Sequence, residues 1–140
     1  MDHFIRCINC GGRFEGDSVI YNCPKCGDLL EVVFDLESIR EGLKASDWAS
    51  RPLSVWRYRE LLPIGRRIEP ISLGEGGTSL HPCPRLGGMA GVRRLMVKNE
   101  GENPTGSFKD RGMTVGITKA LELGKGWVAC ASTGNTSASL

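Results

Sequence analysis

Long apolar runs, a strong net charge and internal repeats are all missing from this sequence of 140 residues. No window approaches the roughly 18 consecutive apolar residues of a membrane-spanning helix. The formal net charge of +2 is too small to indicate binding to nucleic acid or to an acidic membrane surface. The first residues lack a basic stretch followed by an apolar one, so we expect no signal peptide and a cytoplasmic location.

The composition is that of a globular protein, with 40% hydrophobic and 24% charged residues, and it changes twice along the chain. Residues 1–34 are rich in cysteine, glycine and strand formers. Residues 35–70 contain two tryptophans and three prolines, which deny a long regular element and indicate an ordered connecting arm. Residues 71–140 alternate expected strands and helices.

The expected elements predict an α/β fold. Short strands are expected at residues 19–21 and 29–34, and a helix at 36–43. Further along, strands at 93–98 and 127–131 flank a helix at 107–123, with a second helix from residue 136. In the 107–123 helix, residues 107–110 fit a capping box, Gly124 ends the helix, and Met113, Ile117, Ala120 and Leu121 form an apolar face.

A strand–helix–strand order predicts a parallel sheet covered by helices. Two such strands cannot form a sheet covered on both faces, and residue 140 falls one turn into a helix. We therefore expect a fragment: a small N-terminal module followed by the truncated start of a parallel-sheet domain.

Four of the six cysteines lie in two Cys-x-x-Cys pairs separated by twelve residues. A structural zinc ion prefers four tetrahedral thiolates, and each pair can supply two of them from one tight turn. The spacing predicts a zinc ribbon with the ligands Cys7, Cys10, Cys23 and Cys26. A redox dithiol is the alternative, and it fits two matched pairs less well. Cys83 and Cys130 are expected to be free, buried or half-buried thiols.

Lys109 follows a polar turn, in the segment Asn-Pro-Thr-Gly-Ser-Phe-Lys-Asp-Arg at residues 103–111. The positive end of a helix repels an ammonium group, and this, with partial burial, favours the neutral amine, a nucleophile for carbonyl carbon. A solvated surface lysine is the alternative. A second polar segment, Ser-Thr-Gly-Asn-Thr-Ser at residues 132–137, follows an expected strand and opens a helix, where free amides favour anions. An unliganded helix cap is the alternative there.

Together these segments resemble the pyridoxal-phosphate enzymes of the tryptophan-synthase-β type, known as fold type II. The first resembles the lysine motif of that family and the second its asparagine loop. The glycine-rich segment Leu-Gly-Glu-Gly-Gly-Thr-Ser-Leu at residues 73–80 resembles that of threonine synthases, many of which also carry an N-terminal four-cysteine ribbon.

The resemblance implies a role for each matching residue. Lys109 would be the catalytic lysine that forms the internal aldimine with pyridoxal 5′-phosphate, and Asn135 would bond the cofactor's 3′-oxygen. Ser132, Thr133 and Thr136 would hold the substrate carboxylate. The implied reaction converts O-phospho-L-homoserine and water to L-threonine and phosphate. The family's phosphate loop lies far downstream and does not occur here, so the fragment alone is expected to be inactive.

Other functions stay open on the sequence alone. They are another fold type II enzyme, such as a serine/threonine dehydratase or a cysteate-synthase-like enzyme, and a non-catalytic zinc-ribbon fragment. The expected partner is a small amino-acid substrate, with no nucleic acid and no membrane. The sequence does not give the oligomeric state, and a homo-oligomer of the full-length protein stays open.

Overall fold

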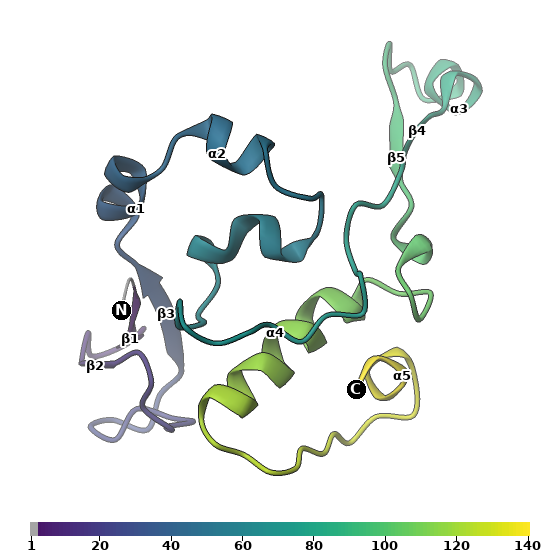
Figure 1. The fold of residues 1–140 in the computed structure, drawn as a ribbon. Helices are drawn as coiled ribbons and strands as arrows, with labels where there is room; N and C mark the ends of the chain where they lie inside the picture. Colours follow the sequence, from purple (N-terminus) through teal and green to yellow (C-terminus); the bar gives the residue numbers. More distant parts are fainter. Residues whose placement is uncertain (1–2) are drawn as a thin grey trace.

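The structure is a computed structural model that describes residues 3–140 (Figure 1). Its N-terminal part is an antiparallel sheet in which β1 (His3–Cys7) lies between β2 (Arg13–Glu15) and β3 (Leu30–Phe34). The strand expected at residues 19–21 is not formed, and that prediction is wrong. Residues 19–21 pair with neither β2 nor β3, the outer strands of this sheet, and Tyr21 is 87% exposed.

The arm that follows contains α1 (Leu36–Gly42), α2 (Ala45–Ala49) and the 3-10 helix η1 (Val55–Leu61). The Asp35 side chain caps α1 by accepting a bond from the backbone N–H of Ser38. Further along the arm, the rings of Trp48 and Tyr58 pack edge to face with centroids 5.6 Å apart. The arm is therefore built from short helices held by side-chain contacts.

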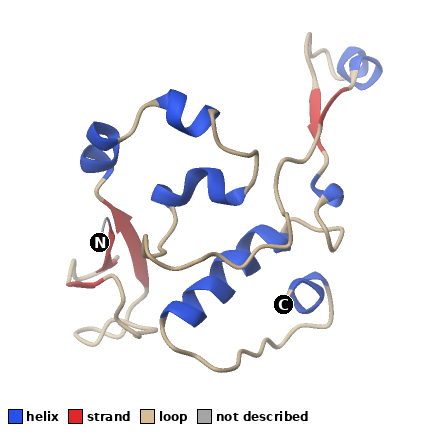
Figure 2. Ribbon diagram, in the orientation of Figure 1, coloured by secondary structure: helices blue, strands red, loops and turns tan. Residues whose placement is uncertain are grey.

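A hairpin projects from the rest of the molecule in Figures 1 and 2. It consists of β4 (Leu80–Pro82), α3 (Pro84–Met89) and β5 (Met96–Lys98), with β4 and β5 antiparallel. The 3-10 helix η2 (Glu100–Glu102) returns the chain to the body of the molecule. The strand expected at residues 93–98 is thus present in its second half.

The helix α4 (Lys109–Glu122) lies at the centre of the molecule and ends at Gly124, which has a positive φ of 69°, as expected. Its buried face differs from the apolar face that the sequence predicts. Asp110, Thr114 and Thr118 are buried, whereas Leu121 is exposed and the other expected apolar residues are half-buried. No helix in residues 3–140 has the length and apolar character of a membrane span.

Threonines lie on the buried face of α4 because the extended segment that contains Ile71 crosses this face. The backbone of that segment needs hydrogen-bond partners, which the threonine side chains provide. The Thr114 hydroxyl donates to the carbonyl oxygen of Ile71, and the Ile71 N–H donates to Thr118 Oγ1 at 3.0 Å. The segment is fixed again at the other end of α4, where the Gly65 N–H donates to Glu122 Oε1 at 2.6 Å. Hydrogen bonds between side chains of α4 and the backbone of this segment therefore decide which face of α4 is covered.

The strand expected at residues 127–131 is not formed, so that prediction is also wrong; Trp127 is 83% exposed. The chain passes through this extended segment to the short helix α5 (Asn135–Ser139), which packs against α4. Within residues 3–140 both sheets are antiparallel, and the expected parallel sheet is not seen. A parallel pair is stable only when helices cover both of its faces, and this part of the molecule does not supply them.

Candidate functional site

The segment before α4 is shaped by a buried asparagine and a tight turn. Asn103, only 4% exposed, donates to the carbonyl oxygen of Glu100 at 2.8 Å and accepts from the N–H of Gly76 at 3.0 Å. Gly106, with a φ of 78°, closes the turn by donating its N–H to the Asn103 carbonyl at 2.7 Å. The segment is thus fixed both to itself and to the glycine-rich residues 73–80.

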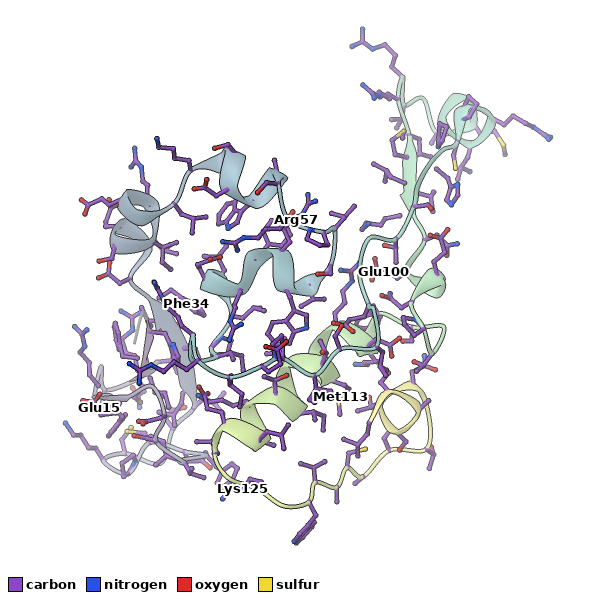
Figure 3. All side chains as sticks on the ribbon, in the orientation of Figure 1. Glu15, Phe34, Arg57, Glu100, Met113 and Lys125 are labelled. Atoms are coloured by element: carbon purple, nitrogen blue, oxygen red, sulfur yellow. The ribbon has the colours of Figure 1, made fainter. Side chains whose placement is uncertain are left out.

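An ion pair next to this turn makes the same connection. Arg111 in α4 donates to both carboxylate oxygens of Glu100, at 2.6 and 2.9 Å, and the Thr78 hydroxyl donates to the same carboxylate at 2.7 Å. Figure 3 labels Glu100 near the beginning of α4. The Arg111 guanidinium is the main cause that lowers the pKa of Glu100 to about 2, so this carboxylate is charged at neutral pH.

Lys109 is the first residue of α4, and its side chain is exposed. Its Nζ lies 4.8 Å from the centre of the Phe108 ring, and within residues 3–140 no carboxylate pairs with it. Two expectations fail here. The lysine is not partly buried, and residues 107–110 form no capping box, because Phe108 is the N-cap and the Ser107 hydroxyl accepts only from the Lys109 N–H, at 3.2 Å. The amine therefore stands free at the positive end of α4.

Asp110 does not cap the helix because its carboxylate bonds other segments. It accepts from the N–H of Thr105 at 2.8 Å, from the Thr105 hydroxyl at 2.5 Å and from the Ser139 hydroxyl at 2.5 Å. Burial alone would raise the pKa of Asp110, but the hydrogen bonds from Ser139 and Thr105 outweigh it and lower the pKa. Asp110 is thus a buried, charged acceptor shared by two segments.

The asparagine segment lies beside the lysine segment in the structure. Asn135 begins α5 and is exposed, as is Thr133, while Ser132 and Thr136 are half-buried. The loop before the helix is held locally, because Ser132 Oγ accepts from the N–H of Gly134 at 3.3 Å. Figure 1 shows α5 against the half of α4 that begins with Lys109, and Figure 3 labels Met113 on the same side.

A cavity of about 1060 Å³ lies at the opposite end of α4, between the N-terminal sheet and the arm. Two carboxylates that line it are already neutralised by neighbours. Lys119 pairs with Glu122 at 2.7 Å, and Arg51 pairs with Glu60 at 2.7 Å. This cavity lies away from the Lys109 end of α4, since the residues of α4 and its C-cap that line it are Leu121, Glu122 and Leu123.

The second cluster is formed by the four cysteines of the N-terminal sheet. All four sulfur atoms lie within 4.8 Å of one another, with Cys7 and Cys26 at 3.5 Å and Cys10 and Cys23 at 3.6 Å. A tetrahedral zinc ion with bonds of about 2.3 Å needs sulfurs roughly 3.8 Å apart. Each pair turns back through a glycine of positive φ, Gly11 and Gly27. The cluster has the dimensions of a zinc site.

The thiols of this cluster ionise unequally. The N–H of Cys10 is the main cause that lowers the pKa of Cys7 to about 7. The N–H of Asp28 lowers the pKa of Cys26, but the neighbouring Cys7 and burial outweigh it and raise that pKa to about 12. Four thiolates this close repel one another, so they ionise together only around a cation. The other two cysteines, Cys83 and Cys130, are free and half-buried, as expected.

Comparison with known proteins identifies the second half of the chain. Residues 71–140 match the family described as pyridoxal-phosphate dependent enzyme. This chain belongs to that family. The match contains both the Lys109 segment and the Asn135 segment, whose proximity is described above.

Relatives extend the similarity to nearly the whole chain. A threonine synthase of Methanosarcina acetivorans is 54% identical over 138 residues, which is 99% of this chain and 33% of the relative. One of Methanocaldococcus jannaschii is 53% identical over 96% of this chain and 33% of its own length. One of Mycobacterium leprae is 56% identical over 59% of this chain. The chain spans about a third of the length of the first two relatives.

The residues near Lys109 fit the cofactor that gives this pyridoxal-phosphate dependent family its name. An aldehyde needs an accessible primary amine, and the Lys109 amine is exposed and unpaired in residues 3–140. A ring oxygen needs a hydrogen-bond donor, and the Asn135 amide is exposed on the neighbouring helix. The donor set is therefore chemically suited to the cofactor.

Sequence reasoning missed the residues that hold the two segments together. Glu100, Thr105 and Ser139 had been given no role, and Asp110 had been expected only to cap the helix. The sequence did offer one indication, because Asp110 directly follows Lys109. Its carboxylate could either cap the helix or accept hydrogen bonds from a distant segment. Only the position of α5 distinguishes these two uses.

Proposed function

We propose that the protein containing this chain is a threonine synthase, which converts O-phospho-L-homoserine and water to L-threonine and phosphate. The observation that carries the proposal is the identity of about half over 99% of the chain to the Methanosarcina acetivorans enzyme, cysteine module included. Because the chain spans a third of that enzyme, the activity is proposed for the protein in which this chain is joined to further segments.

In this proposal Lys109 Nζ binds the cofactor carbonyl and later moves protons at the substrate carbons, since it is the unpaired amine of the site. Asn135 holds the cofactor's 3′-oxygen through its amide. Ser132, Thr133 and Thr136 bind the substrate carboxylate through hydroxyl and backbone donors at the beginning of α5. Pyridoxal phosphate supplies the electron sink for the reaction. The reaction class is then elimination of phosphate and addition of water, carried out by a carbon–oxygen lyase.

The remaining expectations are part of the same proposal. Residues 1–34 form a zinc ribbon in which Cys7, Cys10, Cys23 and Cys26 hold one structural zinc ion. Residues 35–70 are the connecting arm, and residues 71–140 begin the cofactor-binding domain, whose parallel sheet forms when further segments cover it. Six free thiols suit a reducing compartment such as the cytoplasm.

The experiment uses the full-length protein with pyridoxal phosphate and measures phosphate release and L-threonine formation from O-phospho-L-homoserine. Lys109→Ala should lose both the visible absorbance of the bound cofactor and turnover. Lys125→Ala is the matched control, because Lys125 is an exposed lysine beyond the end of α4 (Figure 3). Normal turnover by Lys109→Ala would refute the assignment. Wild-type activity on L-serine or L-threonine alone would instead favour a dehydratase.

A further inference from the structure

The position of α5 depends on a small number of contacts. A helix of five residues is far below the length that is stable by itself in water. Ser139 is its one buried residue, with 6% exposure. In residues 3–140, α5 is joined to segments outside its own loop by the hydrogen bond from the Ser139 hydroxyl to Asp110, beside which Thr105 Oγ1 lies 3.1 Å from Ser139 Oγ.

These contacts lie next to the two residues proposed for the chemistry. Asp110 directly follows Lys109 in the first turn of α4. Ser139 lies four residues after Asn135, one helical turn away on the same side of α5. A hydrogen bond between Asp110 and Ser139 therefore joins the backbone that carries Lys109 to the backbone that carries Asn135.

The chemistry of the contact favours a positioning role over simple stabilisation of α4. A carboxylate in the first turn ordinarily bonds the free N–H groups of its own helix. Here Asp110 is 1% exposed, and its hydrogen bonds go to the Thr105 N–H, the Thr105 hydroxyl and the Ser139 hydroxyl. An ionised carboxylate can accept all three bonds at once, which a neutral amide of the same shape cannot.

We propose that Asp110 is a positioning residue that acts through Ser139 to hold Asn135 at a fixed separation from Lys109. The inference rests on the proposed function, since it assumes that Asn135 contacts the cofactor's 3′-oxygen. Asp110 itself contacts neither cofactor nor substrate in this assignment. Thr105 completes the contact by orienting the carboxylate from the turn before α4.

The first test uses the cofactor spectrum of the full-length protein. Asn135→Ala should shift the visible absorbance maximum, and Ser139→Ala should shift it in the same direction. The double variant should match Asn135→Ala, because Ser139 acts through Asn135. Ser139→Ala should lower kcat roughly tenfold with little change in KM, as expected for the loss of one hydrogen bond to a charged group.

The second test needs no cofactor. In the 140-residue chain, Ser139→Ala and Asp110→Asn should speed amide hydrogen exchange in residues 135–140 roughly tenfold while the middle of α4 keeps its protection. Ser46→Ala is the control, because this exposed serine lies in α2, outside both the lysine segment and the asparagine segment. Its exchange rates and absorbance maximum should remain those of the wild type.

The outcomes separate the inference from the proposed function. If Asn135→Ala shifts the spectrum and Ser139→Ala does not, Asp110 and Ser139 do not position Asn135 and the inference is overturned alone. If Asn135→Ala leaves the spectrum unchanged, the role of Asn135 is wrong and the positioning role is overturned with it. Unchanged exchange in residues 135–140 of both variants would also overturn the inference.

Discussion

At the scale of single residues, carboxylates join distant parts of this chain. Glu60 connects α2 and η1 through Trp48 and Arg51, Glu100 connects the glycine-rich segment to α4, and Asp110 connects α4 to α5. Few apolar side chains are fully buried, so these polar contacts have a large share in fixing tertiary structure. Each carboxylate contributes most when it is ionised.

The stability of the chain in acid therefore tests the contribution of the ion pair between Glu60 and Arg51. The Arg51 guanidinium is the main cause that lowers the pKa of Glu60 from 4.5 to about 2. A pKa lowered on folding contributes stability above the ordinary value and loses it as the pH falls through the lowered one. Unfolding free energy should therefore decline between about pH 4.5 and pH 2.

Chemical unfolding of Glu60→Gln measures this contribution. The variant should be less stable than the wild type by about 1–3 kcal/mol at pH 7, and the difference should shrink towards zero near pH 2. Glu41→Gln, an exposed glutamate of α1, is the control and should be neutral at both pH values. A difference that does not change with pH would mean that packing, and not charge, is responsible.

At the residue scale, the spacing of the four cysteines predicted that they lie together, and their sulfur atoms do; the catalytic role of Lys109 stays a prediction. Prediction failed for Asp110 because a carboxylate after a lysine has several possible partners. One of its partners, Ser139, lies 29 residues away and is brought near by the extended segment between α4 and α5. The exposure of Lys109 was likewise not readable from its neighbours in sequence.

At the scale of elements, helices were predicted more accurately than strands. The helix at 36–43 and the central helix were found within two residues, since helical periodicity and stop signals are local. The expected strands at 19–21 and 127–131 are not formed, because a strand also depends on pairing with a distant segment, which the local sequence does not reveal. The threonine face of α4 also depends on a partner, the crossing segment at Ile71.

The glycine-rich segment gives an element-scale prediction. Gly77 has a φ of 64°, and an added Cβ would lie 2.5 Å from the carbonyl oxygen of Leu53 in the arm. Gly77→Ala should lower the unfolding free energy by about 3 kcal/mol, from the positive φ and the collision together. Gly74→Ala is the matched control, since its φ is 84° and its Cβ would meet open space, so only about 1 kcal/mol is expected.

Thermal or chemical unfolding of the two glycine variants makes the comparison. Both variants place alanine at a positive φ, but only Gly77→Ala meets the arm. The difference between their losses of unfolding free energy therefore measures the cost of the collision with Leu53. Equal losses of stability would show that the arm moves aside at no cost.

Zinc dependence is the second element-scale prediction. The sheet of β1, β2 and β3 buries few apolar residues, so a structural metal should contribute about 10 kcal/mol to its folding. Metal analysis of the purified chain should find one zinc per molecule. A chelator or Cys23→Ser should unfold the sheet, whereas Cys83→Ser should retain the metal. A folded sheet with almost no zinc would contradict the prediction.

At the scale of the whole molecule, the chain exposes more surface than a compact protein of its size. Its accessible area is 9555 Å², whereas a monomer of 15.2 kDa is expected to expose about 7100 Å². Leu121 and Trp127 are among the exposed apolar side chains. This excess agrees with the finding that the chain spans a third of the length of its relatives.

The 140-residue chain alone should therefore have no threonine synthase activity and should bind pyridoxal phosphate weakly. Lys109 and Asn135 are present, but tight binding needs backbone amides around the dianionic phosphate. A cofactor titration followed by absorbance and a phosphate-release assay provide the measurement. Micromolar binding with turnover would show that residues 1–140 hold the complete site.

The projecting hairpin of β4, α3 and β5 is attached close to the candidate site. It is fastened at its base, where Glu102 accepts from the N–H of Ser79 at 2.7 Å and Lys98 Nζ donates to the Thr78 carbonyl at 2.7 Å. The hairpin therefore joins the rest of the molecule next to the ion pair of Glu100 and Arg111, at the beginning of the helix that carries Lys109.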